Sequence, residues 1–187
     1  MELQHVNVKI FVADDSVVDP GRFIDVFHRW IRDEVLDELL IDVADYRHVP
    51  DGPGILLVGH DALYSMDHTG GRWGLRYNRR TVLEGSNEDR IRQAFQAAAW
   101  ACALLEEELR DDTVPLRFSR TEFEVFINDR ALAPRTPEAQ ASYRADLEAF
   151  VYGLVGPAHF ELQHHESSQA RSSVTVHLGQ SYTLAAA

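Results

Sequence analysis

Residues 39–60 decide the fold, and they read LLIDVADYRHVPDGPGILLVGH. Apolar side chains recur at every second position over 39–43, which is typical of a strand with one buried face. Proline and glycine recur over 49–54, and this composition predicts a turn. The run 55–58 is apolar on both faces, so we expect an interior strand covered on each side. The stretch therefore predicts an antiparallel hairpin in which His48 and Ile55 are near neighbours.

The chain beyond this hairpin continues the β pattern. We expect it to stay extended past Gly59, through a bulge, to Asp67. Residues 68–72 predict a hairpin turn, and the strand that follows alternates apolar side chains with Arg72 and Arg76. We expect this arginine-bearing face to be solvated.

Three amphipathic helices flank these strands. The first is predicted to start at Pro20, with Asp19 as its N-cap, because apolar side chains recur at helical spacing as far as residue 35. Ser86 predicts the start of a long helix over 86–110, and Thr136 followed by proline predicts a third over 136–154. Further strands are expected at 6–12, 116–118, 123–127, 160–164 and 173–178.

This element order predicts an α+β fold: a largely antiparallel or mixed sheet with three main helices against one face. The 187 residues suit a single domain over 1–187. The pattern also allows two β-α-β-β halves, 1–85 and 113–180, linked by the helix over 86–110. No residue-level repeat supports a duplication.

Composition excludes several classes of protein. The net charge of −12 should repel nucleic acid, so we expect no nucleic-acid partner. No apolar run approaches the roughly 20 residues that a transmembrane helix needs, and no membrane partner is expected. The N-terminus lacks a basic region followed by an apolar stretch, which favours a soluble cytoplasmic protein. Cys102, the single cysteine, lies in an apolar helical stretch and is expected to pack as a small buried hydrophobe.

A string of potential metal ligands lies in and beside the deciding stretch. Its members are Asp42, Asp45, His48, Asp51, His60 and Asp61. Carboxylates and imidazoles are common ligands of zinc, iron and manganese. In the predicted hairpin, however, His60 lies near Val43, on the order of 16 Å from His48 at ~3.3 Å per residue. One mononuclear site cannot use both histidines, so we predict no metal and no cofactor.

The best candidate for a ligand-binding edge is the Tyr46-Arg47-His48 segment beside the glycine-rich turn. It could supply a proton donor, an anion clamp and exposed backbone N–H groups. The candidate ligand-binding residues are Asp45, Tyr46, Arg47, His48, His60 and Arg76. No phosphate-binding loop, nucleophile elbow or zinc-protease motif occurs, so no catalytic residue is assigned.

These observations favour a binding or protein-interaction module. Arg72, Arg76 and Arg47 could bind an anionic small molecule or an acidic partner, because guanidinium groups suit carboxylates and phosphates. A protein partner, or self-association into a homo-oligomer through an exposed strand edge, is equally compatible. The alternative is a small enzyme that uses Asp45, Arg47, His48 or His60 for acid–base or metal-assisted chemistry. Stoichiometric metal in the purified protein would favour that alternative.

Overall fold

The computed structural model describes residues 2–110, 115–127, 137–166 and 172–184. Its helices are α1 (Arg22–Asp33), α2 (Asn87–Glu108) and α3 (Pro137–Val155). Its strands are β1 (Val6–Val12), β2 (Leu40–Tyr46), β3 (Gly54–Gly59), β4 (Ala62–Asp67), β5 (Gly74–Arg79), β6 (Phe118–Ile127), β7 (Phe160–Glu166) and β8 (Ser172–Leu178). A short 3-10 turn, η1 (Thr69–Gly71), joins β4 to β5.

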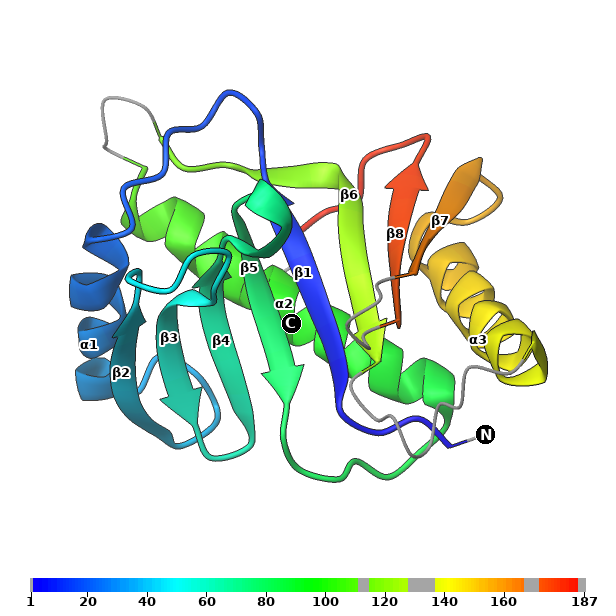
Figure 1. Cartoon of the computed structure of the whole chain (residues 1–187), viewed down its shortest axis with the longest axis horizontal. Helices are drawn as coiled ribbons and strands as arrows, with labels where there is room; N and C mark the ends of the chain where they lie inside the picture. Colours follow the sequence, from blue (N-terminus) through cyan, green and yellow to red (C-terminus); the bar gives the residue numbers. More distant parts are fainter. Residues whose placement is uncertain (1, 111–114, 128–136, 167–171, 185–187) are drawn as a thin grey trace.

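All eight strands form one antiparallel sheet in the order β2-β3-β4-β5-β1-β6-β8-β7. The central β1 pairs with β5 on one side and with β6 on the other. Strands from before and after the long helix α2 therefore share one sheet (Figure 1). The predicted α+β class, with an antiparallel sheet and three helices, is confirmed.

The described helices gather on one side of this sheet. In Figure 1, α2 crosses behind the central strands, and it packs against β1, β5 and α3, while α1 packs against β2. The hydrophobic core lies between these layers and includes Trp30, Phe95, Phe123 and Phe150. Cys102 is fully buried in this core, as predicted. The opposite side of the sheet, which we call the helix-free face, carries a different set of side chains.

The second helix starts as its sequence predicts. The Ser86 hydroxyl accepts a hydrogen bond from the Asp89 N–H at 3.1 Å, and the Asp89 carboxylate accepts one from the Ser86 N–H at 2.9 Å. This is a capping box, which satisfies two donors that the helix leaves unpaired. The first helix differs, because it begins at Arg22 with Gly21 as N-cap. Asp19 instead accepts a hydrogen bond from the Gly21 N–H at 3.0 Å in the turn before it.

Two predictions of strand boundaries are wrong. The chain does not stay extended to Asp67, because β3 ends at Gly59 and β4 returns antiparallel beside it. The Glu38 carboxylate stabilises the turn between them, accepting hydrogen bonds from the Asp61 and Ala62 N–H groups at 3.0 Å each. Conversely, the strands expected at 116–118 and 123–127 are largely one strand, β6.

The register of the deciding hairpin also differs from the prediction. Ile55 pairs with Asp45, three residues before the expected His48. The connection is therefore longer than predicted, and its first turn is closed by a hydrogen bond from the Val49 N–H to the Tyr46 carbonyl at 2.9 Å. Within β3 one face is fully buried and the other is only half-buried, so the helix-free side is not covered as predicted.

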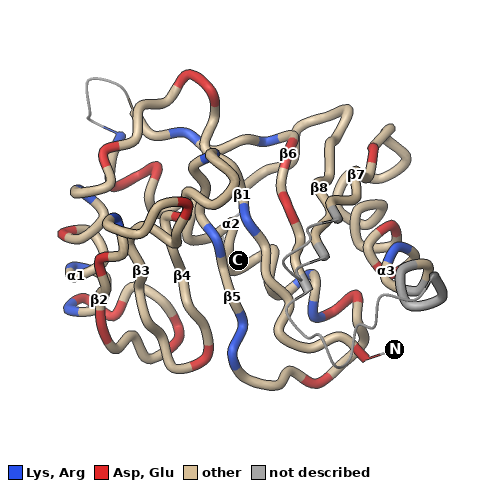
Figure 2. The backbone as a smooth tube through the Cα atoms, in the orientation of Figure 1, with Lys and Arg blue, Asp and Glu red and all other residues tan. Residues whose placement is uncertain are grey.

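A row of polar side chains crosses the helix-free face. It runs through Ser65, Arg76, Lys9, Glu124 and Thr175, which are register partners on adjacent strands. Figure 2 shows basic positions on β1 and β5 beside acidic positions on β6. Only 7% of Arg76 is exposed, so the expectation of a solvated arginine face is wrong at this residue. Its guanidinium lies over the Phe126 ring, 4.4 Å from the ring centroid, which shields it from water.

No helix in the described part of the chain is both long enough and apolar enough to cross a membrane.

Candidate functional site

Four of the predicted site residues come together at the end of β2. Arg47 donates to Asp45 through Nε at 2.9 and 3.0 Å and through Nη2 at 2.6 Å, and its backbone N–H adds a further hydrogen bond at 3.0 Å. The side-chain bonds, followed by the backbone bond, lower the pKa of Asp45 to about 2. The Tyr46 and His48 rings stack with their centroids 6.1 Å apart. All four residues are exposed.

The other two predicted site residues lie elsewhere. His60 follows β3, at the far end of that strand from the 47–53 connection, with its Nδ1 3.2 Å from the Asp61 carboxylate. Arg76 lies in the middle of β5, two strands beyond β3 in the sheet. The six residues therefore do not form one site, and the Asp45–Arg47 pair is separate from both His60 and Arg76.

Four of the large apolar side chains that are exposed in the described residues lie in or beside the edge strand β2. We call the segment 39–49 the β2 edge. Leu39 is 69% exposed, Ile41 54%, Tyr46 41% and Val49 40%. The other edge strand, β7, is different, because its apolar Phe160 and Leu162 are half-buried and its exposed side chains are polar. Isolated exposed hydrophobics are normal, but a cluster on a sheet edge is typical of an interaction surface.

Aspartate side chains at the β2 edge bond to the strand's own backbone. The Asp42 carboxylate accepts a hydrogen bond from the Val43 N–H at 2.8 Å. That N–H is therefore occupied and cannot at the same time pair with a further strand. Charged side chains placed on an edge strand in this way disfavour its pairing with strands of other chains.

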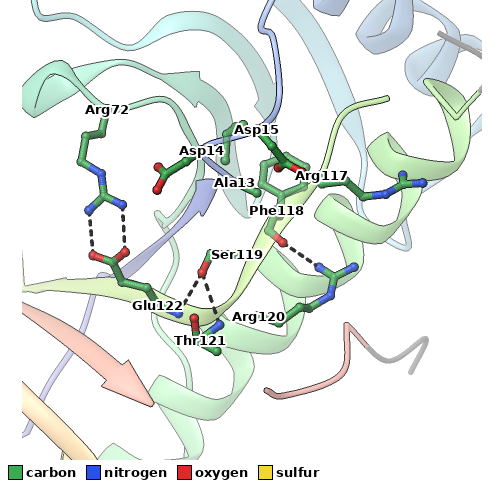
Figure 3. Close-up of a pocket in the computed structure, with 11 residues that line it drawn as sticks. Ala13, Asp14, Asp15, Arg72, Arg117, Phe118, Ser119, Arg120, Thr121 and Glu122 are labelled. Carbon is green, nitrogen blue, oxygen red and sulfur yellow. Dashed lines mark hydrogen bonds and ion pairs between the residues drawn. The ribbon is translucent and has the colours of Figure 1, made fainter. Parts of the chain in front are cut away.

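A pocket of about 510 Å³ opens beyond the end of β1, next to the starts of β5 and β6 (Figure 3). Its lining comes from three parts of the chain: residues 12–15, Arg72 and residues 117–122. In Figure 3 the Arg72 guanidinium and the Glu122 carboxylate face each other, and they form two hydrogen bonds of 2.7 and 2.8 Å. This bidentate pair lowers the pKa of the Glu122 carboxyl group.

The cations of this pocket are largely neutralised. Arg72 is paired with Glu122, and Arg120 donates to Glu106 at 2.7 Å. Within the described part of the chain, Asp14 and Asp15 form no hydrogen bond or ion pair. Sequence reasoning missed this pocket because its lining comes from three separate segments, the first and last of them more than a hundred positions apart, and none belongs to a motif.

The buried Lys9 at the centre of the helix-free face has a structural role. Its ammonium group donates to Asp67 Oδ1 at 2.7 Å and to the Thr69 carbonyl at 2.9 Å. Asp67 in turn accepts from the Thr69 N–H and hydroxyl at 3.1 and 2.9 Å. These bonds hold the turn between β4 and β5. Burial lowers the pKa of Lys9, and the Asp67 carboxylate opposes this shift only in part.

Among the described residues, no three histidine, cysteine, aspartate or glutamate side chains come close enough to hold a metal ion. Comparison of the chain with protein-family models, with curated proteins and with solved structures found no match.

Proposed function

We propose that the chain is a binding module that recognises a protein partner at the β2 edge. The observation that carries this proposal is the cluster of exposed apolar side chains on that edge, at Leu39, Ile41, Tyr46 and Val49. Elsewhere in the described chain, comparably exposed large apolar residues are scattered singly, at Val17, Val82 and Tyr152.

Burial of this cluster would supply a driving force for association. Apolar surface contributes roughly 25 cal/mol per Å² when it leaves water. An edge strand adds unpaired backbone groups beside that surface, and partners that bind as an extra strand use both features. The β7 edge offers backbone groups without the apolar cluster, which supports β2 as the binding edge.

Selection of a random peptide library on the immobilised protein tests this proposal. We expect enriched sequences whose binding is lost in Ile41→Lys and retained in Val82→Lys. Ile41 and Val82 are 54% and 67% exposed, so both substitutions place a lysine on the surface with little risk to folding. Failure to enrich any sequence, or enrichment of sequences that bind Ile41→Lys equally well, would contradict the proposal.

A second candidate function is the binding of an anionic small molecule in the pocket of Figure 3. Its volume of about 510 Å³ lies within the usual range for small-molecule sites. Arg117 is the cation that supports this candidate, because among the described residues its guanidinium donates to the Leu116 carbonyl and pairs with no carboxylate. A screen of small carboxylates and phosphates by thermal shift, repeated on Arg117→Ala, would test it.

The enzyme alternative has less support. The acid–base residues proposed for it, Asp45, Arg47 and His48, lie at one end of β3, while His60 follows the other end. Elemental analysis of the untagged protein tests this alternative directly, since a stoichiometric transition metal would revive it. The cytoplasmic location and the homo-oligomeric state stay predictions.

A further inference from the structure

We infer that the β2 edge binds an extended basic segment of its partner, which adds a strand beside β2 and draws the Asp42 carboxylate away from the Val43 N–H. This inference rests on the proposed function and names the chemistry of the partner. It combines the charge of the edge, the hydrogen bond made by Asp42 and the exposed apolar side chains.

The charge of the edge selects a basic partner. The β2 edge itself contains Asp42 and Asp45, and the residues that flank it add Glu34, Asp37, Glu38 and Asp51. The only arginine in this part of the chain is Arg47, which is already paired with Asp45. The whole chain carries a net charge of −12, so its long-range field attracts basic segments. A second copy of this chain would instead bring acidic edges together, which disfavours self-pairing.

Asp42 links the charge of the partner to strand addition. In the free chain its carboxylate satisfies the Val43 N–H at 2.8 Å. A lysine or arginine of the partner offers that carboxylate a charge-assisted hydrogen bond, which is stronger than one to a neutral amide. Once the carboxylate turns toward the cation, the Val43 N–H is available to a carbonyl of the added strand. An acidic or neutral segment offers no such exchange and leaves the N–H occupied.

The apolar side chains of the edge supply the remaining contacts. Ile41 and Tyr46 are 54% and 41% exposed on the strand itself, and Leu39 precedes it at 69%. Asp42 and Tyr46 belong to the helix-free face of the sheet, whereas α1 packs on the other side of β2. Side chains of a strand alternate between its two faces. A segment in which basic and β-branched residues alternate therefore places its cations toward Asp42 on one face.

The test uses three synthetic peptides of the same 7-residue length as β2. The first alternates lysine with valine, the second replaces lysine by glutamate, and the third keeps all lysines but replaces the central valine by proline, which cannot donate to a strand ladder. We expect the first peptide to bind at least about tenfold more tightly than either control, measured by calorimetry at fixed salt. We also expect slower hydrogen exchange at the Val43 amide, followed by NMR, when the first peptide is bound.

Matched variants distinguish binding at the β2 edge from non-specific attraction to the negative charge of the whole chain. Ile41→Lys should weaken binding of the lysine–valine peptide about tenfold or more, while Val82→Lys should leave it nearly unchanged. Asp42→Asn should weaken it several-fold, and Asp37→Asn, which removes the same charge from an exposed residue outside the strand, should have a much smaller effect.

Several results would overturn the inference. Equal binding of the proline peptide would mean that attraction is only electrostatic, and equal effects of Asp42→Asn and Asp37→Asn would remove the role of the carboxylate. Binding of neutral or acidic library sequences that depends on Ile41 would leave the proposed function standing and overturn the basic partner. If no peptide of any composition binds at the edge, both the inference and the proposed function fail.

Discussion

Replacement of Lys9 by methionine should destabilise the protein strongly. Lys9 is 0% exposed and its ion-pair partner Asp67 is 1% exposed. Removing one member of a buried ion pair leaves the other charge without compensation, at a cost of about 3–5 kcal/mol. Methionine keeps most of the volume of the lysine stem, so the loss comes mainly from the charge.

The contacts of Asp67 place the expected loss near the lower end of that range. In Lys9→Met the Asp67 carboxylate keeps its hydrogen bonds to the Thr69 N–H and hydroxyl, and Arg76 lies 3.9 Å away. We therefore expect a loss of about 3 kcal/mol in the free energy of unfolding. For a chain of this size, that corresponds to a fall in the melting temperature of roughly 6–12 °C.

Urea denaturation of four proteins measures this effect: the parent chain, Lys9→Met, Asp67→Leu and the double variant. In the double variant, the loss in the free energy of unfolding should be smaller than the sum of the two single losses by at least about 2 kcal/mol. The reason is that the double variant leaves no buried charge without a partner. A loss below about 1 kcal/mol in Lys9→Met, or strictly additive single losses, would refute the reasoning.

The pH dependence gives an independent check on Lys9. Because burial lowers its pKa in the folded chain, the unfolded chain binds more protons than the folded chain at pH values between the two pKa values. Lys9 therefore makes the free energy of unfolding increase with pH between its lowered pKa in the folded chain and its ordinary pKa of 10.5. This contribution should be absent from Lys9→Met when unfolding free energies are compared across that range.

Three further predictions concern other contacts. Ser86→Ala should lower the unfolding free energy by about 1 kcal/mol, measured by urea denaturation, because it removes the cap of α2. Glu38→Ala should lower the unfolding free energy by about 2 kcal/mol in the same assay, because three donors, including the Tyr64 hydroxyl, lose their acceptor. It should also make amide hydrogen exchange faster at the β3–β4 turn. The pKa of Glu122 is lowered by Arg72, so the stability from this pair is complete above about pH 4.5 and is lost as pH falls through the folded-state pKa. Thermal unfolding between pH 7 and pH 3 should show a smaller loss in Glu122→Gln than in the parent chain.

Much of the fold could be predicted from the sequence, because interactions between residues close together in the chain determine several of its strands and helix ends. The alternation over 6–12 predicted β1, and the capping signal at Ser86 predicted the start of α2. The β3–β4 turn was missed because its stability comes from Glu38, an acid more than twenty residues away. The sequence near Gly59 predicts a bulge, and no residue close to it in the sequence indicates that the Glu38 carboxylate binds there.

The candidate site was predictable only in part for a similar reason. Asp45 and Arg47 are two residues apart in the sequence, so their ion pair can be predicted without knowledge of the fold. Arg76 alternates with apolar residues as a solvated side chain would, yet it is buried against Phe126 from β6, a strand that no pattern near residue 76 reveals. The pocket lining likewise depends on the pairing of β1 with β6, which only the folded sheet establishes.

The β2 edge combines two properties that usually oppose each other. Exposed leucine, isoleucine and tyrosine side chains on or beside an edge strand favour pairing with other chains, which makes such an edge an aggregation hazard. Aspartates at positions 42 and 45 oppose pairing, and Asp42 also occupies a backbone donor of the strand. The basic strand proposed above would remove this opposition, because its cations would pair with the aspartates while its apolar side chains cover the exposed apolar surface. The same aspartates would repel an acidic copy of the chain, so the edge would discriminate between partners by their charge.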